Sequence, residues 1–550
     1  MMKRNRRLPS QIRLLAIAAA TCASASHVSA FDIDTGNPDL SVRWDNTFKY
    51  STAWRVKAPS AELTGPASAN HDDGNLNFGK GRISNRVDWL TEADVVYARN
   101  YGFRLSAAAW YDSVYNGRND NPGFAGGAFP NNWSIPSNAF SDETRRLHGR
   151  KADLLDAFVF GGFDVGDTRL NLRLGRHSVL WGETLFFGMN GIAGAMAPVD
   201  VIKLASVPGT QFKEAIRPTP QISAQWQLSS NVSVGAFYQF NWEENRLPAA
   251  GSYFSGLDFQ PAGGVALNTG PGVQAMRRAD QKPSDLGQGG VQLRFTALET
   301  DFGLYAVRFH SKTPQQVNNI GVLGLDSYQL AYQQGITALG ASASHAFGPM
   351  QVSAEASIRR NQDLASSAAV DLGPIFGLPI TTNNTNNPGY AVGRTAHINL
   401  STMWTLPSTP LAREAMLMGE IMWNRVLSVD KNPGALDPNS TRDAISLRLL
   451  FEPTYRQVLP GLDIGVPIGV GYSPKGSRSR TLGPALPPDN GGDFTIGLNG
   501  SYLDEWRFSV NYTSYFGSAK PILAGNPPSF SYGQFMRDRN FVSLSVRRTF

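Results

Sequence analysis

This chain of 550 residues contains a single cysteine, Cys22, close to its N-terminus. Residues 1–30 are typical of a secretory signal peptide, because five basic residues accompany a short apolar stretch and Val28-Ser29-Ala30 offers a small-residue cleavage site. The apolar stretch, residues 14–23, is too short to span a bilayer as a helix. Cleavage after residue 30 would leave no cysteine, which excludes disulfides, thiol catalysis and cysteine-based metal sites.

A strong charge of either sign is also lacking once the signal is removed. The full chain has 50 Lys+Arg against 44 Asp+Glu, and five of the bases fall within residues 1–30, so the mature balance is about 45 against 44. This near-neutral balance gives no ground for a nucleic-acid partner or for attraction to an anionic membrane surface.

Long apolar runs and catalytic motifs are missing as well. After residue 30 no uncharged apolar run approaches twenty residues, so we expect no membrane-spanning helix. No P-loop, G-x-S-x-G elbow or H-E-x-x-H spacing occurs, and the seven histidines are scattered. The segment His71-Asp72-Asp73-Gly74-Asn75-Leu76-Asn77 vaguely resembles a calcium loop, but it lacks the distal Glu of an EF-hand, which favours a solvated surface turn. We therefore expect no enzymatic activity, no cofactor and no metal.

Alternation of period two is what the sequence has in abundance. In residues 40–57 apolar or aromatic side chains mostly alternate with polar or charged ones. Successive side chains of a strand point to opposite faces, so this segment presents one face suited to lipid and one suited to water. It is about three times as long as an average strand. Its length favours a membrane-spanning strand over an ordinary half-buried one.

The same alternation recurs along the chain and predicts about eighteen strands (16–18), separated alternately by short turns and long loops. An even count with both termini in the periplasm closes without a free edge. We therefore predict an all-β protein: a Sec signal peptide over residues 1–30 and a single closed antiparallel transmembrane β-barrel over residues 31–550, integral to the bacterial outer membrane. The predicted strands are residues 40–57, 82–98, 102–116, 152–164, 167–176, 219–228, 231–242, 288–297, 301–310, 338–347, 350–360, 394–405, 415–427, 442–454, 462–473, 493–503, 506–517 and 538–550.

The chain ends on an aromatic residue, Phe550, which closes an amphipathic stretch over residues 541–550. Such an ending resembles the C-terminal signal of outer-membrane barrels, which the barrel-assembly machinery reads. We therefore expect Phe550 to act as an assembly signal. The expected surroundings are outer-membrane lipid and lipopolysaccharide.

A barrel of this size is wide enough for an aqueous or plugged lumen. Charged rows on the first two strands are expected to face that lumen, because charges facing lipid are costly. Their mixed signs favour internal ion pairs over a strongly selective tunnel, and substrate contact is the alternative to structural packing. The predicted lumen charges are Arg43, Asp45, Lys49, Arg55, Arg86, Asp88, Glu92 and Asp94.

The long loop expected over residues 177–218 is unusually apolar, and its part from residue 184 to 199 carries no charge. Water would solvate such a loop poorly, so we predict that it folds into the lumen as a constriction or plug. A lid packed on neighbouring loops and an extra strand pair are the alternatives. The substrate-path candidates are Arg176, His177, Trp181, Glu183, Phe186, Phe187, Met189, Glu214 and Arg217.

The segment Leu174-Gly175-Arg176-His177-Ser178-Val179-Leu180-Trp181-Gly182-Glu183, with Asp72-Asp73-Gly74-Asn75-Leu76-Asn77-Phe78, resembles a large proteobacterial outer-membrane family known mainly as a domain of unknown function. The resemblance covers the whole mature chain. Members tend to be encoded beside a periplasmic protein similar to lipoprotein-sorting proteins, an RND-superfamily transporter and catabolic genes for hydrophobic compounds. The resemblance thus implies those two proteins as partners and traffic of hydrophobic molecules across the outer membrane.

The resulting hypothesis is an outer-membrane channel or transporter for hydrophobic or amphipathic small molecules. A Leu-Gly-Arg element before a loop, here Leu174-Gly175-Arg176, is also seen in phosphate-selective porins, so a water-filled porin for small polar solutes stays open. A barrel enzyme acting on lipids is a third interpretation, because Ser, His and Asp can meet across strands whatever their order in the chain. A structural or surface-binding barrel is the fourth.

Overall fold

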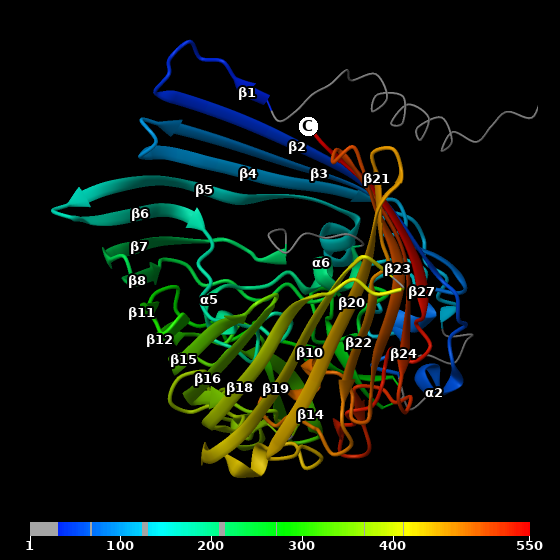
Figure 1. Ribbon diagram of the computed structural model, residues 1–550. Helices are drawn as coiled ribbons and strands as arrows, with labels where there is room; N and C mark the ends of the chain where they lie inside the picture. The colour runs from blue at the N-terminus through cyan, green and yellow to red at the C-terminus, as the bar shows by residue number, and fades with distance from the viewer. Residues whose placement is uncertain are drawn as a thin grey trace, which may run out of the picture.

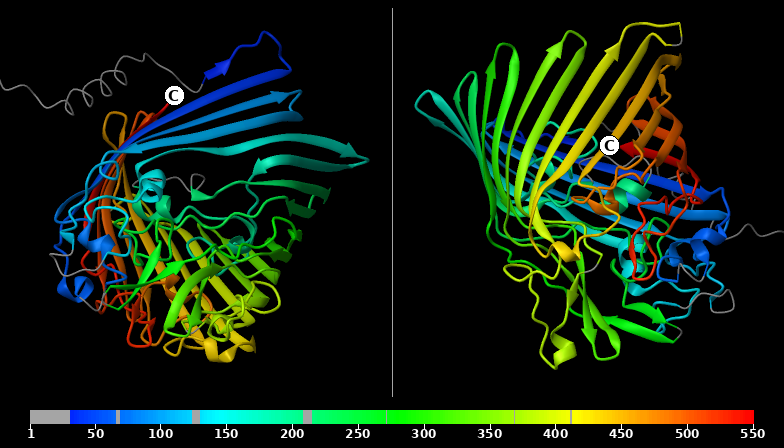
Figure 2. Two further views of the ribbon diagram at one scale, coloured as in Figure 1. Left: turned by 180° about the vertical axis from the view of Figure 1, so that it is seen from behind. Right: turned by 90° about the horizontal axis from the view of Figure 1, so that it is seen from below.

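The computed structural model describes residues 31–65, 69–123, 130–207, 215–270, 272–367, 369–410 and 412–550. In these residues one 20-stranded antiparallel sheet closes on itself, because the last strand pairs with the first long one (Figures 1 and 2). One member, β1 (Phe31–Ile33), pairs only with β2, and β21 and β22 form two halves of a single crossing. Removing β1 and counting β21 with β22 leaves 18 crossings. The predicted closed β-barrel is confirmed.

The crossing strands follow one another around the wall in chain order, so every connection is a hairpin. They are β2 (Leu40–Arg55), β3 (Gly81–Tyr97), β4 (Tyr101–Asp112), β5 (Arg150–Val165), β6 (Thr168–His177), β7 (Thr219–Ser229), β8 (Val232–Gln239), β11 (Gln288–Ala297), β12 (Thr300–Phe309), β15 (Ile336–Phe347), β16 (Met350–Asp363), β18 (Val392–Leu406), β19 (Glu414–Lys431), β20 (Asp443–Leu459), β21 (Leu462–Gly465) with β22 (Ile468–Ser473), β23 (Gly491–Tyr502), β24 (Trp506–Phe516) and β27 (Phe541–Thr549).

The pleat separates the two faces as the period of two requires. On β2 and β3, Phe48 and Trp89 are exposed on the outer face and stack on each other, whereas Lys49 and Asp88 are buried on the inner face. The terminal Phe550 stacks on Phe48 with 5.7 Å between ring centroids. The chain end therefore completes the outer apolar surface. None of the helices in the described residues is long and apolar enough to cross a membrane.

The end of the barrel that holds the short turns is the periplasmic end in outer-membrane barrels, and the long loops gather at the other end. These loops carry short elements of their own. Five short strands form a second sheet in the order β17-β13-β14-β10-β9, which the alternation did not predict because its strands are only two to eight residues long. The strands of this sheet are β9 (Ala266–Gly270), β10 (Val273–Arg277), β13 (Gln315–Gly321), β14 (Gly324–Ala331) and β17 (Val370–Asp371).

The remaining elements are short helices and one strand pair. The pair is β25 (Leu523–Ala524) with β26 (Ser529–Phe530). The helices are α2 (Ala61–Thr64), α3 (Asp73–Leu76), α4 (Asp142–Thr144), α5 (Ala193–Met196), α6 (Val201–Ser206), η3 (Arg145–Gly149), η4 (Gly373–Phe376), η5 (Pro433–Ala435) and η6 (Gly483–Ala485).

The interpretation of residues 71–77 as a solvated turn is wrong, because Asp72, Asn75 and Asn77 are buried where the loop after β2 meets the loop after β8. That contact joins segments almost two hundred residues apart, which no local pattern reveals. The signal peptide, with Cys22, and the candidate Glu214 lie outside the described residues.

Candidate functional site: a loop and a charged cavity in the lumen

The described part of the loop between β6 and β7, residues 178–207 and 215–218, enters the lumen, and its first half lies against the opposite wall. There Glu355 of β16 accepts hydrogen bonds from the main-chain N–H groups of Glu183 at 2.7 Å and Ile192 at 2.6 Å. A glycine is required beside this carboxylate: Gly182 has φ +100°, and a Cβ on it would lie 2.2 Å from Glu355 Oε2. The predicted inward fold of the loop is therefore confirmed.

A second wall carboxylate, Glu420 of β19, holds the next turn of the loop. Its Oε2 accepts main-chain hydrogen bonds from Leu185 at 3.2 Å and Phe187 at 2.9 Å, and also one from Phe186. Its Oε1 accepts from Asn399 Nδ2 of β18 at 2.7 Å. Glu420 is 2% exposed, so these donors take the place of water around its carboxylate. Most of the donors are main-chain N–H groups of the loop.

Three further polar groups hold the loop from the same side of the barrel. Asn190 donates to Asn399 Oδ1 at 2.9 Å, and Arg359 of β16 donates to the carbonyl of Gly191 at 2.8 Å. Lys312, just after β12, donates to a carbonyl of α5 at 3.1 Å. The anchors outside the loop, Asn399, Arg359 and Lys312, lie on or just after strands that are distant from it in sequence. The only sequence signal for them is an isolated charged or polar residue in an inward row.

The side chains of the loop divide into an anchored group and a group facing the open lumen. Trp181 is buried against Phe237 of β8 and Tyr305 of β12, with ring centroids 5.1 and 6.3 Å away. Its role in this structure is packing rather than solute contact. Glu183 extends toward Arg294 of β11, with 3.7 Å between Oε1 and the guanidinium.

Phe186, Phe187 and Met189 are half-buried, so part of each apolar side chain faces the lumen. Across from them, the guanidinium of Arg448 of β20 lies 6.0 Å from the ring centroid of Phe186. Arg448 also pairs with Asp493 of β23 at 3.2 Å. An apolar loop surface thus lies beside a charged stretch of wall.

A cavity of about 810 Å³ lies toward the long-loop end, between the loop and the wall formed by β5 and β6. Its lining residues include eight Lys or Arg and five Asp or Glu, together with apolar side chains such as Trp242 and Leu330. Two predicted candidates meet here: Arg176 and Arg217 both bind Glu243, at 2.8 and 2.6 Å. The local sequence does not predict a role for Glu243, because this residue lies just after β8 and not in the loop between β6 and β7.

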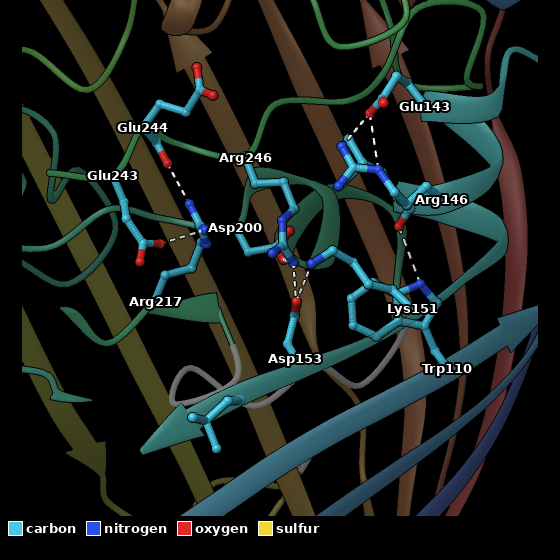
Figure 3. A network of polar contacts seen from close by, with 12 residues as sticks. Trp110, Glu143, Arg146, Lys151, Asp153, Asp200, Arg217, Glu243, Glu244 and Arg246 are labelled. Carbon is cyan, nitrogen blue, oxygen red and sulfur yellow. Dashed lines mark hydrogen bonds and ion pairs between the residues drawn. The ribbon is translucent and has the colours of Figure 1, made fainter. Parts of the chain in front are cut away.

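A second ion-pair group in this cavity centres on Arg246 (Figure 3). Its guanidinium binds Asp153 of β5 at 2.6 Å and Asp200 at 2.7 Å, and Asp200 caps α6 by accepting from the main-chain N–H of Lys203 at 3.0 Å. Burial alone would lower the pKa of Arg246, but Asp200 and Asp153 raise it. The cation is thus fully charged and fixed in place.

A buried tryptophan of β4, Trp110, collects three cations around its ring. The charged groups of Arg86, Lys203 and Arg246 lie 4.7, 5.4 and 5.9 Å from a ring centroid. The negative face of an indole ring stabilises cations that are partly removed from water. Three cations therefore gather where α6 approaches the wall, and two of them, Arg86 and Arg246, are also paired with carboxylates.

Three cavities follow one another along this side of the lumen. The first is the 810 Å³ cavity; a second, of about 10 Å³, is lined by residues that include Lys49, Asp88, Lys203 and Arg547; a third, of about 530 Å³, lies toward the short turns. Lys203 borders the first two, and Arg547 of β27 borders the last two. The smallest of the three cavities is therefore lined by the cations Lys49, Lys203 and Arg547 together with one carboxylate, Asp88.

The predicted lumen charges form ion pairs of mixed sign. Arg86 pairs with Asp88 at 2.6 Å, and Arg104, which was not among the predictions, binds Asp94 at 2.9 Å and also Glu92. Nearer the short turns Arg43 pairs with Asp45 at 2.9 Å, while Lys49 is buried in the wall. At the opposite end, Arg55 lies beneath the long loops beside Asp538 at 3.2 Å. The candidate His177 is buried in the wall, 2.7 Å from Ser223 Oγ.

The chain is similar to one protein family and to several solved structures. A family model described as "Protein of unknown function (DUF1302)" matches residues 11–550. No curated protein sequence matches the chain. Among solved structures, OccAB4 of Acinetobacter baumannii is similar with 10% identity and a TM-score of 0.42, over 92% of this chain and 98% of that one. OccAB1 of the same organism has 10% identity and a TM-score of 0.43, over 92% and 96%. OccK2 (OpdF) of Pseudomonas aeruginosa has 11% identity and a TM-score of 0.39, over 92% and 97%. At these identities the similarity concerns the fold alone.

Proposed function

The chain belongs to the DUF1302 family of proteins of unknown function, and from that premise we propose that this outer-membrane barrel is a selective channel for small amphipathic molecules that carry an anionic group. The observation that supports the proposal most is the row of three cavities, of which the smallest is lined by Lys49, Lys203 and Arg547 with Asp88 as its single carboxylate. A solute with a carboxylate gains from these cations, while a cationic solute is repelled.

The apolar part of the proposed solute is supported by two surfaces. Phe186, Phe187 and Met189 present apolar area to the lumen from an uncharged segment. The first cavity adds Trp242, Leu330 and Tyr332 to its charged lining. Binding sites for small molecules commonly combine apolar walls with a few placed polar groups. A solute with one anionic group and one ring or short chain fits both surfaces.

A plain water-filled porin for polar solutes fits the described residues less well. The cavity between Lys203 and Arg547 is about 10 Å³, whereas roughly 10–15 Å³ is needed to hold one water molecule. Passage of a solute along this row of cavities would then require movement at the second one. The solute's own gradient or a partner would supply the energy, and the two partners implied by the family resemblance remain part of this proposal.

The test is the current through the refolded mature protein in a planar bilayer. We expect small or gated conductance that favours anions, and stronger block of that current by phenylacetate than by acetate or by the neutral phenylacetamide. Lys203→Met should reduce anion preference and block. Arg278→Met is the matched control, because this exposed arginine pairs with Asp326 in a loop and does not line the cavities.

Large, steady, weakly selective openings that none of the three solutes blocks would overturn the proposal and favour the porin. Equal block by phenylacetamide and phenylacetate would remove the anionic group from the requirement. Equal block by acetate and phenylacetate would remove the apolar part.

A further inference from the structure

The two long loops that follow β2 and β8 meet at a cluster of three carboxylates. Asp72 and Asp73 come from the first loop, Asp258 comes from the second, and an oxygen of each lies within 4.8 Å of the others. Asp72 and Asp258 are each 2% exposed. The main chain binds the loops together at the same place, since Asp73 N–H donates to Asp258 Oδ2 at 3.2 Å and Asp258 N–H donates to Asn70 O at 3.0 Å.

This cluster lacks the hydrogen bonds that buried carboxylates require. Among the described residues, Asp72 Oδ2 and Asp258 Oδ1 are buried and have no donor. The side chain of Asp73 receives a single bond, from Asn121 Nδ2 at 3.3 Å. A buried ionised oxygen without a partner is strongly destabilising. The unpartnered oxygens belong to residues of both loops, so the deficit lies where the loops join.

Elsewhere the same chain satisfies a buried loop carboxylate completely. Asp371 is 1% exposed. It accepts from the main-chain N–H groups of Gly373 at 2.8 Å, Thr381 at 2.8 Å and Thr382 at 2.6 Å. Those bonds lower its pKa although burial opposes them. A buried carboxylate in these loops can thus be fully satisfied by N–H donors, and the three-carboxylate cluster lacks such donors.

Charge is also unbalanced around the cluster. Of the two nearby cations, Arg55 pairs with Asp538, which cancels it. Arg539 directs its guanidinium to neutral oxygens: Asn75 Oδ1 at 2.9 Å and the carbonyls of Tyr253 and Ser255 at 2.6 and 2.5 Å. Three carboxylates with one arginine leave two negative charges.

We propose that Asp72, Asp73 and Asp258 bind one calcium ion that holds the loop after β2 to the loop after β8. Oxygen-only ligands with carboxylates in an irregular arrangement suit calcium, which accepts six to eight oxygens, better than magnesium, which requires a near-ideal octahedron. Water and main-chain oxygens would complete the coordination. The close approach depends on Gly74, because a Cβ there would lie 2.7 Å from Ser255 O and 2.8 Å from Ser252 O of the other loop.

The test is calcium binding by the refolded protein in detergent, free of lipopolysaccharide, which binds calcium itself. Isothermal titration with CaCl₂ should show one site per chain. Asp258→Asn and Asp72→Asn should each weaken binding by at least tenfold, and MgCl₂ should bind more weakly than CaCl₂. Asp371→Asn, a buried loop carboxylate with its own N–H donors, should bind calcium like the unchanged protein.

Thermal unfolding gives a second test, because the midpoints of the unchanged protein and of Asp258→Asn should respond differently to calcium and to EGTA. Calcium should raise the midpoint of the unchanged protein relative to EGTA, because it binds the folded state. Asp258→Asn should abolish that rise, yet should have a higher midpoint than the unchanged protein in EGTA, because it removes one of three repelling charges. No site at millimolar calcium, or unchanged binding in both Asn variants, would overturn the proposal. These measurements involve no solute, so their outcome is independent of the channel proposal.

Discussion

Replacing Glu420 by alanine should release the lumen loop and enlarge the pore. This carboxylate accepts three main-chain hydrogen bonds from residues 185–187 and a fourth from Asn399. A hydrogen bond to a charged group contributes about 1.5–3 kcal/mol, so the three loop bonds amount to roughly 4–9 kcal/mol if they were additive. They share one oxygen, and we expect about 3–5 kcal/mol in practice.

A loss of that size shifts the equilibrium between the anchored and the released loop by roughly two to three orders of magnitude or more. Glu420→Gln should have a smaller effect, because its carbonyl still accepts while the charge assistance is lost. The assay is single-channel conductance in a planar bilayer. We expect larger and longer openings in the order unchanged protein, Glu420→Gln, Glu420→Ala.

The matched control is Glu452→Ala. Glu452 is on the neighbouring strand, β20, and lines the cavity near the short turns, where it accepts from Asn499 at 3.2 Å and makes no hydrogen bond to the loop. Replacing Glu452 should leave the size and duration of the openings as they are in the unchanged protein. Correct insertion is checked by heat-modifiable gel mobility. If inserted Glu420→Ala, and then the Glu355→Ala/Glu420→Ala double variant, conduct like the unchanged protein, the loop is not the gate.

Three further predictions concern the same loop. Gly182→Ala should displace the loop, because the new Cβ would collide with the wall carboxylate beside it and φ is +100°. The conductance should therefore rise. Gly188→Ala should leave the conductance unchanged, because its Cβ would have no neighbour closer than 3.8 Å. Replacing Phe186 and Phe187 by Asp should weaken block by phenylacetate by roughly tenfold or more, the loss expected for about 1.5 kcal/mol of apolar contact, while gel mobility shows an intact barrel. Burial lowers the pKa of Lys312 to about 7 from 10.5, so its protonation opposes folding; the unfolding midpoint should rise between pH 7 and 10. Lys312→Met should show a smaller rise over that range, and an unchanged slope would contradict the assignment.

The barrel itself could be predicted from the sequence. In the bilayer each strand must bond its backbone to neighbours and alternate an apolar with a polar face, so every crossing leaves a local period of two. The eighteen predicted segments correspond one by one to the crossing strands from β2 to β27. The inward fold of the loop after β6 was also foreseeable, because its composition is locally unsuited to water.

The tertiary structure alone decided what each functional side chain contacts. Glu355 and Glu420 lie more than 150 residues from the main chain that they hold, and Glu243 joins Arg176 to Arg217 only because two hairpins of the wall place it there. Closure of a barrel brings many inward rows to one lumen, and each row is compatible with many partners. Period two tells which residues face inward, but only the register and the folded loops determine which of them meet.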